Sequence, residues 1–157
     1  MLQYDYEHHE GVAGFVAALT GLRRGFGKCK AIGVLKDNRP IAGIVYHNYN
    51  PEAGIIELVA GALPKTVWMT RETIWRVYEY PFLQLKCQMV MQLTPAENER
   101  LLRQAAAVGY MFIKFPRAFG RDRDGVICLL TREAWEDSKI IQRAKPREAL
   151  APRKDAA

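Results

Sequence analysis

The sequence predicts an α/β (α+β) fold with a mixed, mostly antiparallel sheet and one parallel pair of strands. Two observations lead to this prediction. Three strand-like segments between residues 30 and 60 are separated only by short turns, which is typical of an antiparallel meander. After Pro64 the pattern changes to helix, strand and helix, and a helix that connects two neighbouring strands makes those strands parallel.

The first part of the chain supplies one helix and the three strands of the meander. Val12, Phe15, Val16 and Leu19 recur at helical spacing and predict a helix over 11–22. Turn-forming residues then separate runs that are rich in apolar and β-branched side chains. The predicted strands are 30–36, 41–49 and 55–60, with turns at 37–40 and 50–54.

The second part of the chain alternates helices with strands. Thr70 is a suitable N-cap for a helix that ends near Pro81, because proline disrupts a helix interior. Thr94 and Pro95 predict the start of another helix, which Gly109 ends. The remaining predicted elements are strands at 87–93, 110–115 and 126–130, a charged loop at 116–125 and a helix at 132–143.

Length and charge set limits on the kind of protein. The 157 residues suit a single domain, predicted over 1–143, followed by a disordered basic tail over 144–157. The net charge of +6 favours an anionic partner, such as nucleic acid, a phosphorylated cofactor or an acidic protein. No apolar run approaches the roughly 20 residues that span a bilayer, and the N-terminus does not resemble a signal peptide, so no membrane partner is predicted.

The cysteines and histidines indicate neither disulfides nor a metal site. Cys29, Cys87 and Cys128 are odd in number and far apart, so we expect reduced, buried thiols in a cytoplasmic protein. His8 and His9 lack further ligands at suitable spacing, and no metal is predicted.

One stretch resembles a known family. Asn98 in the run 95–103, followed by Gly109 and Tyr110, is similar to a helix motif of the GNAT acyltransferase superfamily, and 124–135 is similar to its final strand. The likeness covers about residues 11–135. It implies a GNAT-like sheet with helices on both faces, in which strands 55–60 and 87–93 splay apart around the pantetheine arm of acetyl-CoA or another acyl-CoA.

The resemblance also implies which residues bind the coenzyme. The peptide amides of Leu58, Val59, Ala60 and Gly61 would hold the thioester and the pantetheine, and Asn98 would contact the arm. The family cradles the pyrophosphate in a glycine-containing loop, whereas 63–73 has no glycine. The candidates there are Lys65, Thr66, Thr70 and Arg71, together with the amides of the helix start.

The resemblance implies that Glu57 is the candidate general base, since it takes the place of the family's strand-borne glutamate, and it is a lone carboxylate in an apolar strand. Such a group should have a raised pKa or a cation beside it. Antiparallel pairing would bring His47 near Glu57, and the two would form a workable dyad. The alternatives are a solvated glutamate and an ordinary surface histidine. Ala105 occupies the place of the tyrosine that serves as the acid in many family members, so no general acid is identified.

Candidate acceptor-binding residues lie in two loops. Trp68 precedes the start of the predicted helix, and its ring is a candidate for one wall of a ligand-binding site. Arg117, Phe119, Arg121 and Arg123 are suited to gripping phosphate and stacking on a base, although a solvated hairpin explains them equally well.

These observations predict an acyl-CoA-dependent N-acyltransferase that acetylates a primary amine, as a monomer or homodimer, with the acceptor unidentified. The residue composition of segments 47–51 and 68–71 resembles that of divergent GNAT-like proteins encoded by bacteriophages. One branch of these, the Mom-type proteins, modifies adenine, so a phage enzyme with DNA as partner is one alternative. A non-catalytic GNAT-fold binding module is another, which the glycine-free loop and Ala105 favour.

Overall fold

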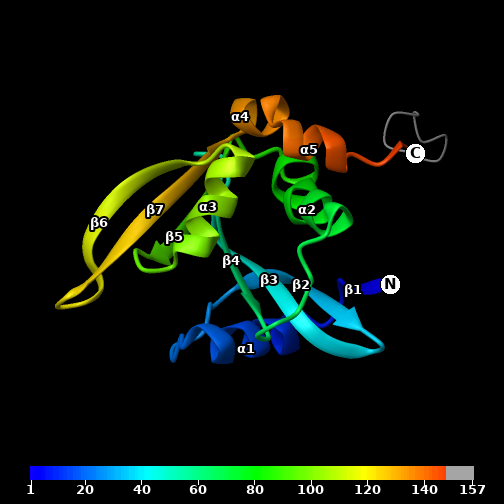
Figure 1. Ribbon diagram of the computed structural model, residues 1–157, viewed down its shortest axis with the longest axis horizontal. Coiled ribbons are helices and arrows are strands. Elements are labelled where there is room, and N and C mark those ends of the chain that lie inside the picture. The colour runs from blue at the N-terminus through cyan, green and yellow to red at the C-terminus, as the bar shows by residue number, and fades with distance from the viewer. Residues whose placement is uncertain (148–157) are drawn as a thin grey trace.

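The computed structural model describes residues 1–147 and contains a seven-stranded sheet with helices on both faces (Figure 1). The strand order is β1-β2-β3-β4-β5-β7-β6, and all neighbours are antiparallel except β4 and β5. The predicted mixed sheet, meander and parallel pair are therefore confirmed. The strands are β1 (Leu2–Asp5), β2 (Cys29–Lys36), β3 (Arg39–Asn50), β4 (Ile55–Ala62), β5 (Met89–Pro95), β6 (Met111–Gly120) and β7 (Arg123–Thr131).

The helical segments divide between the two faces of the sheet. Helix α1 covers one face of β2, β3 and β4, and the others lie on the opposite side (Figure 1). These helices are α1 (His9–Thr20), α2 (Arg71–Tyr78), the π-helical turn η1 (Glu79–Gln84), α3 (Glu99–Val108), α4 (Arg132–Asp137) and α5 (Lys139–Ala144). Within residues 1–147, no helix is both long and apolar enough to cross a membrane.

The alternation of side chains along β3 directs two separate clusters to the two faces. Val45 packs with Ala13 and Val16 of α1. Tyr46 points the other way, and its hydroxyl donates a hydrogen bond to the carbonyl of Val77 in α2. Because successive residues of a strand face opposite sides, one strand contributes to both layers of core.

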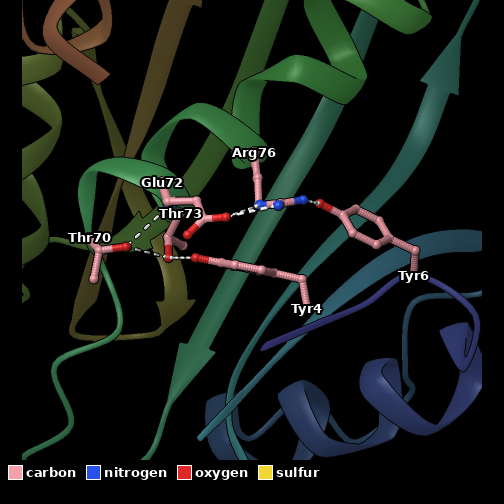
Figure 2. Close-up of polar contacts among 6 residues, drawn as sticks. All are labelled: Tyr4, Tyr6, Thr70, Glu72, Thr73 and Arg76. Atoms are coloured by element: carbon pink, nitrogen blue, oxygen red, sulfur yellow. Dashed lines mark hydrogen bonds and ion pairs between the residues drawn. The ribbon is translucent and has the colours of Figure 1, made fainter. Parts of the chain in front are cut away.

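Strand β1 was not predicted, and side chains far away in the sequence hold it in place. It pairs with β2 at the edge of the sheet and contacts α2 (Figure 2). The Tyr4 hydroxyl lies 2.7 Å from Oγ1 of Thr73, and the guanidinium of Arg76 stacks 4.3 Å from the Tyr4 ring centroid. Nη1 of Arg76 also donates to the Tyr6 hydroxyl at 2.6 Å.

Several predicted boundaries were wrong. The helix predicted from Thr94 starts four residues later, because Thr94 and Pro95 continue β5 and pair with β7. Asn98 is the N-cap of α3, where its side chain accepts from the Leu101 amide. Asn98 therefore marks the start of the helix, whereas the predicted start at Thr94 and Pro95 would have placed it inside the helix. The predicted loop over 116–125 is mostly strand, since β6 and β7 extend to a tight turn at 121–122.

The C-terminal helix is also divided. Ser138 is extended and buried, and it separates α4 from α5. Ala144, which the sequence assigned to the tail, is the last residue of α5 and is 8% exposed. Residues 148–157 of the predicted tail lie outside the described residues.

The three cysteines are free thiols. Cys87 and Cys128 are buried as predicted, and Cys29 is only half-buried. Burial raises the pKa of all three thiols, that of Cys128 to about 11. They are therefore protonated and unreactive at neutral pH.

Candidate active site between strands β4 and β5

Strands β4 and β5 are paired over only a short distance. The parallel register joins Ile55–Glu57 to Met89–Met91 and then stops. Beyond that point β4 pairs only with β3, and β5 pairs only with β7. Because alternate residues of a strand direct their peptide groups toward each neighbour, the rest of β4 has unpaired peptide groups facing the gap. The predicted splay is therefore present.

Three adjoining cavities surround this gap. The α1-side cavity, of about 680 Å³, lies between the C-terminal end of α1, the gap and the β6–β7 hairpin. The loop-side cavity, of about 420 Å³, lies between the β4–α2 loop and α3. The inner cavity, of about 120 Å³, lies beneath α2 and α3. Leu101 lines all three cavities, which shows that they meet at the start of α3.

The predicted pantetheine-binding residues line these cavities. Leu58 and Ala60 border both the α1-side and the inner cavities, Val59 borders the first and Gly61 the second. Asn98 borders the α1-side and loop-side cavities even though its side chain caps α3. The structure thus brings together the β4 residues and the residue on α3 that the resemblance selected.

The predicted pyrophosphate-binding residues are split between two places. Lys65 and Thr66 line the loop-side cavity, and Lys65 has a φ of 61°, a left-handed conformation that favours glycine. Thr70 and Arg71 instead line a separate hollow beside β1. The Thr70 hydroxyl is directed at Thr73, where it caps α2 (Figure 2). The structure therefore does not group Thr70 and Arg71 with Lys65.

Trp68 lies on the side of the gap next to α2 and α3 rather than at the hairpin. It lines both the loop-side and inner cavities and is half-buried against the main core. The other predicted acceptor residues lie on the β6–β7 hairpin. Phe119 and Arg123 line the α1-side cavity, whereas Arg117 and Arg121 are exposed on the same hairpin.

Glu57 and His47 are brought together as predicted. They are directly opposite one another in the β3–β4 register, and Nε2 of His47 lies 3.2 Å from Oε2 of Glu57. This nitrogen is buried and makes no aligned hydrogen bond among the described residues. The ring of Phe26 packs edge-on against His47 at 5.1 Å.

The contact with His47 determines the protonation of Glu57. It lowers the pKa of the Glu57 carboxyl, burial opposes this effect, and the Asn48 side chain adds to it. The raised pKa, one of the two situations that we expected for Glu57, is therefore wrong, because His47 lies beside the carboxylate. Glu57 is ionised at neutral pH, as a group that accepts a proton must be.

Sequence reasoning missed a buried hydroxyl pair on the inner cavity. The Tyr78 and Tyr110 hydroxyls lie 2.9 Å apart, and Nε2 of Gln92 donates to Tyr110 at 2.8 Å. Burial raises the pKa of Tyr78 to about 12 and raises that of Tyr110 well above its usual value, so both are neutral hydrogen-bond donors at neutral pH. Their local patterns indicate only core residues, and no signal in the sequence links positions 32 apart.

Two arginines that follow α1 were also missed as site residues. Arg23 and Arg24 line the α1-side cavity opposite the hairpin. In the sequence they simply follow the helix predicted over 11–22, and their position in the site depends on how α1 packs.

Comparisons with known proteins establish the fold. No protein-family model and no curated protein sequence matches the chain. A point mutant of spermidine N-acetyltransferase from Vibrio cholerae matches with a TM-score of 0.69 and 15% identity, over 92% of this chain and 98% of that one. The dodecameric form of that acetyltransferase in an intermediate state matches with a TM-score of 0.72 and 14% identity, over 88% and 98%. The chain therefore has the fold of the GNAT N-acetyltransferases.

Proposed function

We propose that the protein is an acyl-CoA-dependent N-acyltransferase that transfers an acetyl group to a primary amine. The observation that carries the proposal is the opening between β4 and β5, with free peptide groups on one side and an ionised carboxylate at its closed end. The fold shared with N-acetyltransferases supports the same activity.

The residues around the gap fit an acyl-CoA. The free amides of β4 between Leu58 and Gly61 suit the amide-containing pantetheine arm, as an added strand would. Lys65 and Arg100 line the loop-side cavity and supply positive charge for the pyrophosphate, with Thr66 beside them. The left-handed backbone at Lys65 allows this loop to turn without glycine.

The chemistry requires a base, an oxyanion donor and an acid. Bound acetyl-CoA would supply a thioester, whose C–S bond breaks as the amine nitrogen forms a new C–N bond. Glu57 accepts the proton of the attacking amine, directly or through a water, and His47 holds the carboxylate in place. A free β4 amide stabilises the developing negative charge on the carbonyl oxygen. Tyr78 or Tyr110 donates a hydrogen bond to the leaving thiolate, and the proton that Glu57 took from the amine is the one that converts this thiolate into the thiol product.

Calorimetric titration with acetyl-CoA tests the coenzyme site. We expect binding by the wild type and a large loss in Ala60→Leu, because Ala60 lines two of the cavities at the gap. Ala107→Leu makes the same change on the exposed side of α3 and should bind normally. Absence of binding to the wild type at millimolar acetyl-CoA would refute the proposal.

Thiol release with a panel of amines tests the base. Glu57→Gln should lower kcat/KM by roughly 10²–10⁴-fold, the usual contribution of general base catalysis. Glu52→Gln, in the exposed turn before β4, is the matched control. A fully active Glu57→Gln variant would refute the role of Glu57 as the base, whereas no thiol release by the wild type with any amine would favour the non-catalytic module.

The exposed arginines of the hairpin favour one alternative. Arg117 and Arg121, with the overall charge of +6, suit a phosphate backbone, as a phage enzyme that modifies adenine in DNA would require. That alternative predicts DNA binding that weakens steeply with salt, and altered nucleosides in DNA from cells that express the protein. Phage origin and a cytoplasmic location stay predictions.

A further inference from the structure

The α1-side cavity carries an excess of positive charge. Arg23 and Arg24 line it from the segment after α1, and Arg123 lines it from β7. No aspartate or glutamate is among the lining residues within 1–147. Arg123 is paired with Glu97, but neither Arg23 nor Arg24 forms an ion pair with any described residue. Two guanidinium groups therefore remain uncompensated at this cavity.

These arginines lie on the side of the gap that Glu57 faces. Val59 packs against the apolar cluster that includes Ala13 and Val16 of α1, and Glu57 is two residues earlier on the same face of β4. Phe26, from the same segment as Arg23 and Arg24, packs on His47. When the amino group of an acceptor reaches Glu57 from this cavity, the rest of the acceptor therefore lies beside the two arginines and the Phe119 ring.

A cavity of this kind selects acceptors by charge. A guanidinium binds a carboxylate or phosphate through two parallel hydrogen bonds, and it repels further ammonium groups. The cavity volume of about 680 Å³ is typical of sites that enclose a small molecule. A polyamine brings additional positive charges and has no group that matches Arg23 or Arg24.

We propose that the acceptor is a small amine that also carries a carboxylate or a phosphate, bound by Arg23 and Arg24, and that polyamines are poor acceptors. This inference rests on the proposed acyl transfer. It adds the substrate class, which differs from the spermidine named for the structural neighbours.

Matched acceptor pairs test the inference with the full-length protein and acetyl-CoA. Phenylalanine against phenethylamine isolates a carboxylate, glucosamine 6-phosphate against glucosamine isolates a phosphate, and spermidine represents polyamines. Initial rates of thiol release give kcat/KM for each. In at least one pair we expect kcat/KM to be about tenfold or more higher for the anionic member, because a hydrogen bond between charged groups contributes that much. This preference should shrink with added salt.

Charge-reversal variants then assign the preference to these residues. Arg23→Glu/Arg24→Glu should abolish or invert it while the Kd for acetyl-CoA stays unchanged. Lys36→Glu/Arg39→Glu reverses the same charge on the exposed β2–β3 turn and should change neither.

Three outcomes would overturn the inference. The first is acetyl-CoA binding with no anionic member preferred, or with spermidine as the best acceptor. The second is an acceptor preference that survives reversal of Arg23 and Arg24. The third is reversal that weakens acetyl-CoA binding and leaves the preference intact, which would assign the arginines to the coenzyme. All three presuppose that acetyl-CoA binds, whereas failure to bind it refutes the proposed function itself.

Discussion

Replacement of Gly43 by alanine should destabilise the protein through the contact between α1 and β3. A Cβ at Gly43 would lie 2.7 Å from Cγ2 of Val16 and 2.9 Å from Cγ1 of Val12. Carbon atoms in contact are normally about 3.5–4.0 Å apart, so α1 must shift outward or the two valines must leave their rotamers. The change therefore tests the packing that forms one wall of the α1-side cavity.

The magnitude follows from two opposing effects. Overpacking by one methyl group costs about 1–3 kcal/mol, and the loss of chain entropy in the unfolded state returns about 0.4–1 kcal/mol. We expect the free energy of unfolding to fall by about 1–2 kcal/mol. For a domain of this size that corresponds to a decrease in Tm of about 2–8 °C.

Urea denaturation and thermal melting measure the effect, and Gly14→Ala is the matched control. Gly14 is exposed in the middle of α1, and a Cβ there meets nothing within 4 Å. That variant should gain about 0.5–1 kcal/mol. In the Gly43→Ala background, Val16→Ala should cost less than it does alone, because it removes the nearest clashing atom. Equal stability changes for Gly43→Ala and Gly14→Ala would show that α1 does not pack on β3 in this way.

Three further variants test contacts at the candidate site. Tyr110→Phe leaves Tyr78 and Gln92 without a buried partner and should lower the free energy of unfolding by about 1–3 kcal/mol in urea, and no loss would contradict the hydroxyl pair. Asn98→Ala removes the cap of α3 and should cost about 1 kcal/mol, whereas Asn98→Asp should retain most of the stability. The pKa of Glu57 is lower in the folded protein than in the unfolded chain, so its ionised carboxylate stabilises the fold at any pH above the unfolded-state pKa. This stabilisation is lost as the pH falls through the folded-state pKa. The wild type should be more stable than Glu57→Gln by less than about 1 kcal/mol at pH 7, since the His47–Glu57 pair is partly exposed. This difference in the free energy of unfolding should shrink toward pH 3. A difference that grows in acid would contradict the His47 contact.

The sequence determined those features that depend on neighbouring residues. Alternating apolar side chains and short turns specify the meander of β2, β3 and β4, and that register alone brings His47 opposite Glu57. Thr70 caps α2 as predicted, and Thr131 caps α4 in the same way, because an N-cap hydroxyl accepts a hydrogen bond from an amide three residues later. These are local relations that pattern and propensity reveal.

Contacts between distant segments were decided only by the tertiary structure. β1 is too short to show a pattern, and Tyr4 and Tyr6 secure it through residues about 70 positions away. The start of α3 at Asn98 depends on β7, which keeps Thr94 and Pro95 in the sheet. Arg23 and Arg24 face the cavity because of where α1 ends against the sheet. Packing between segments depends on the shapes of both partners, and neither local sequence contains that information.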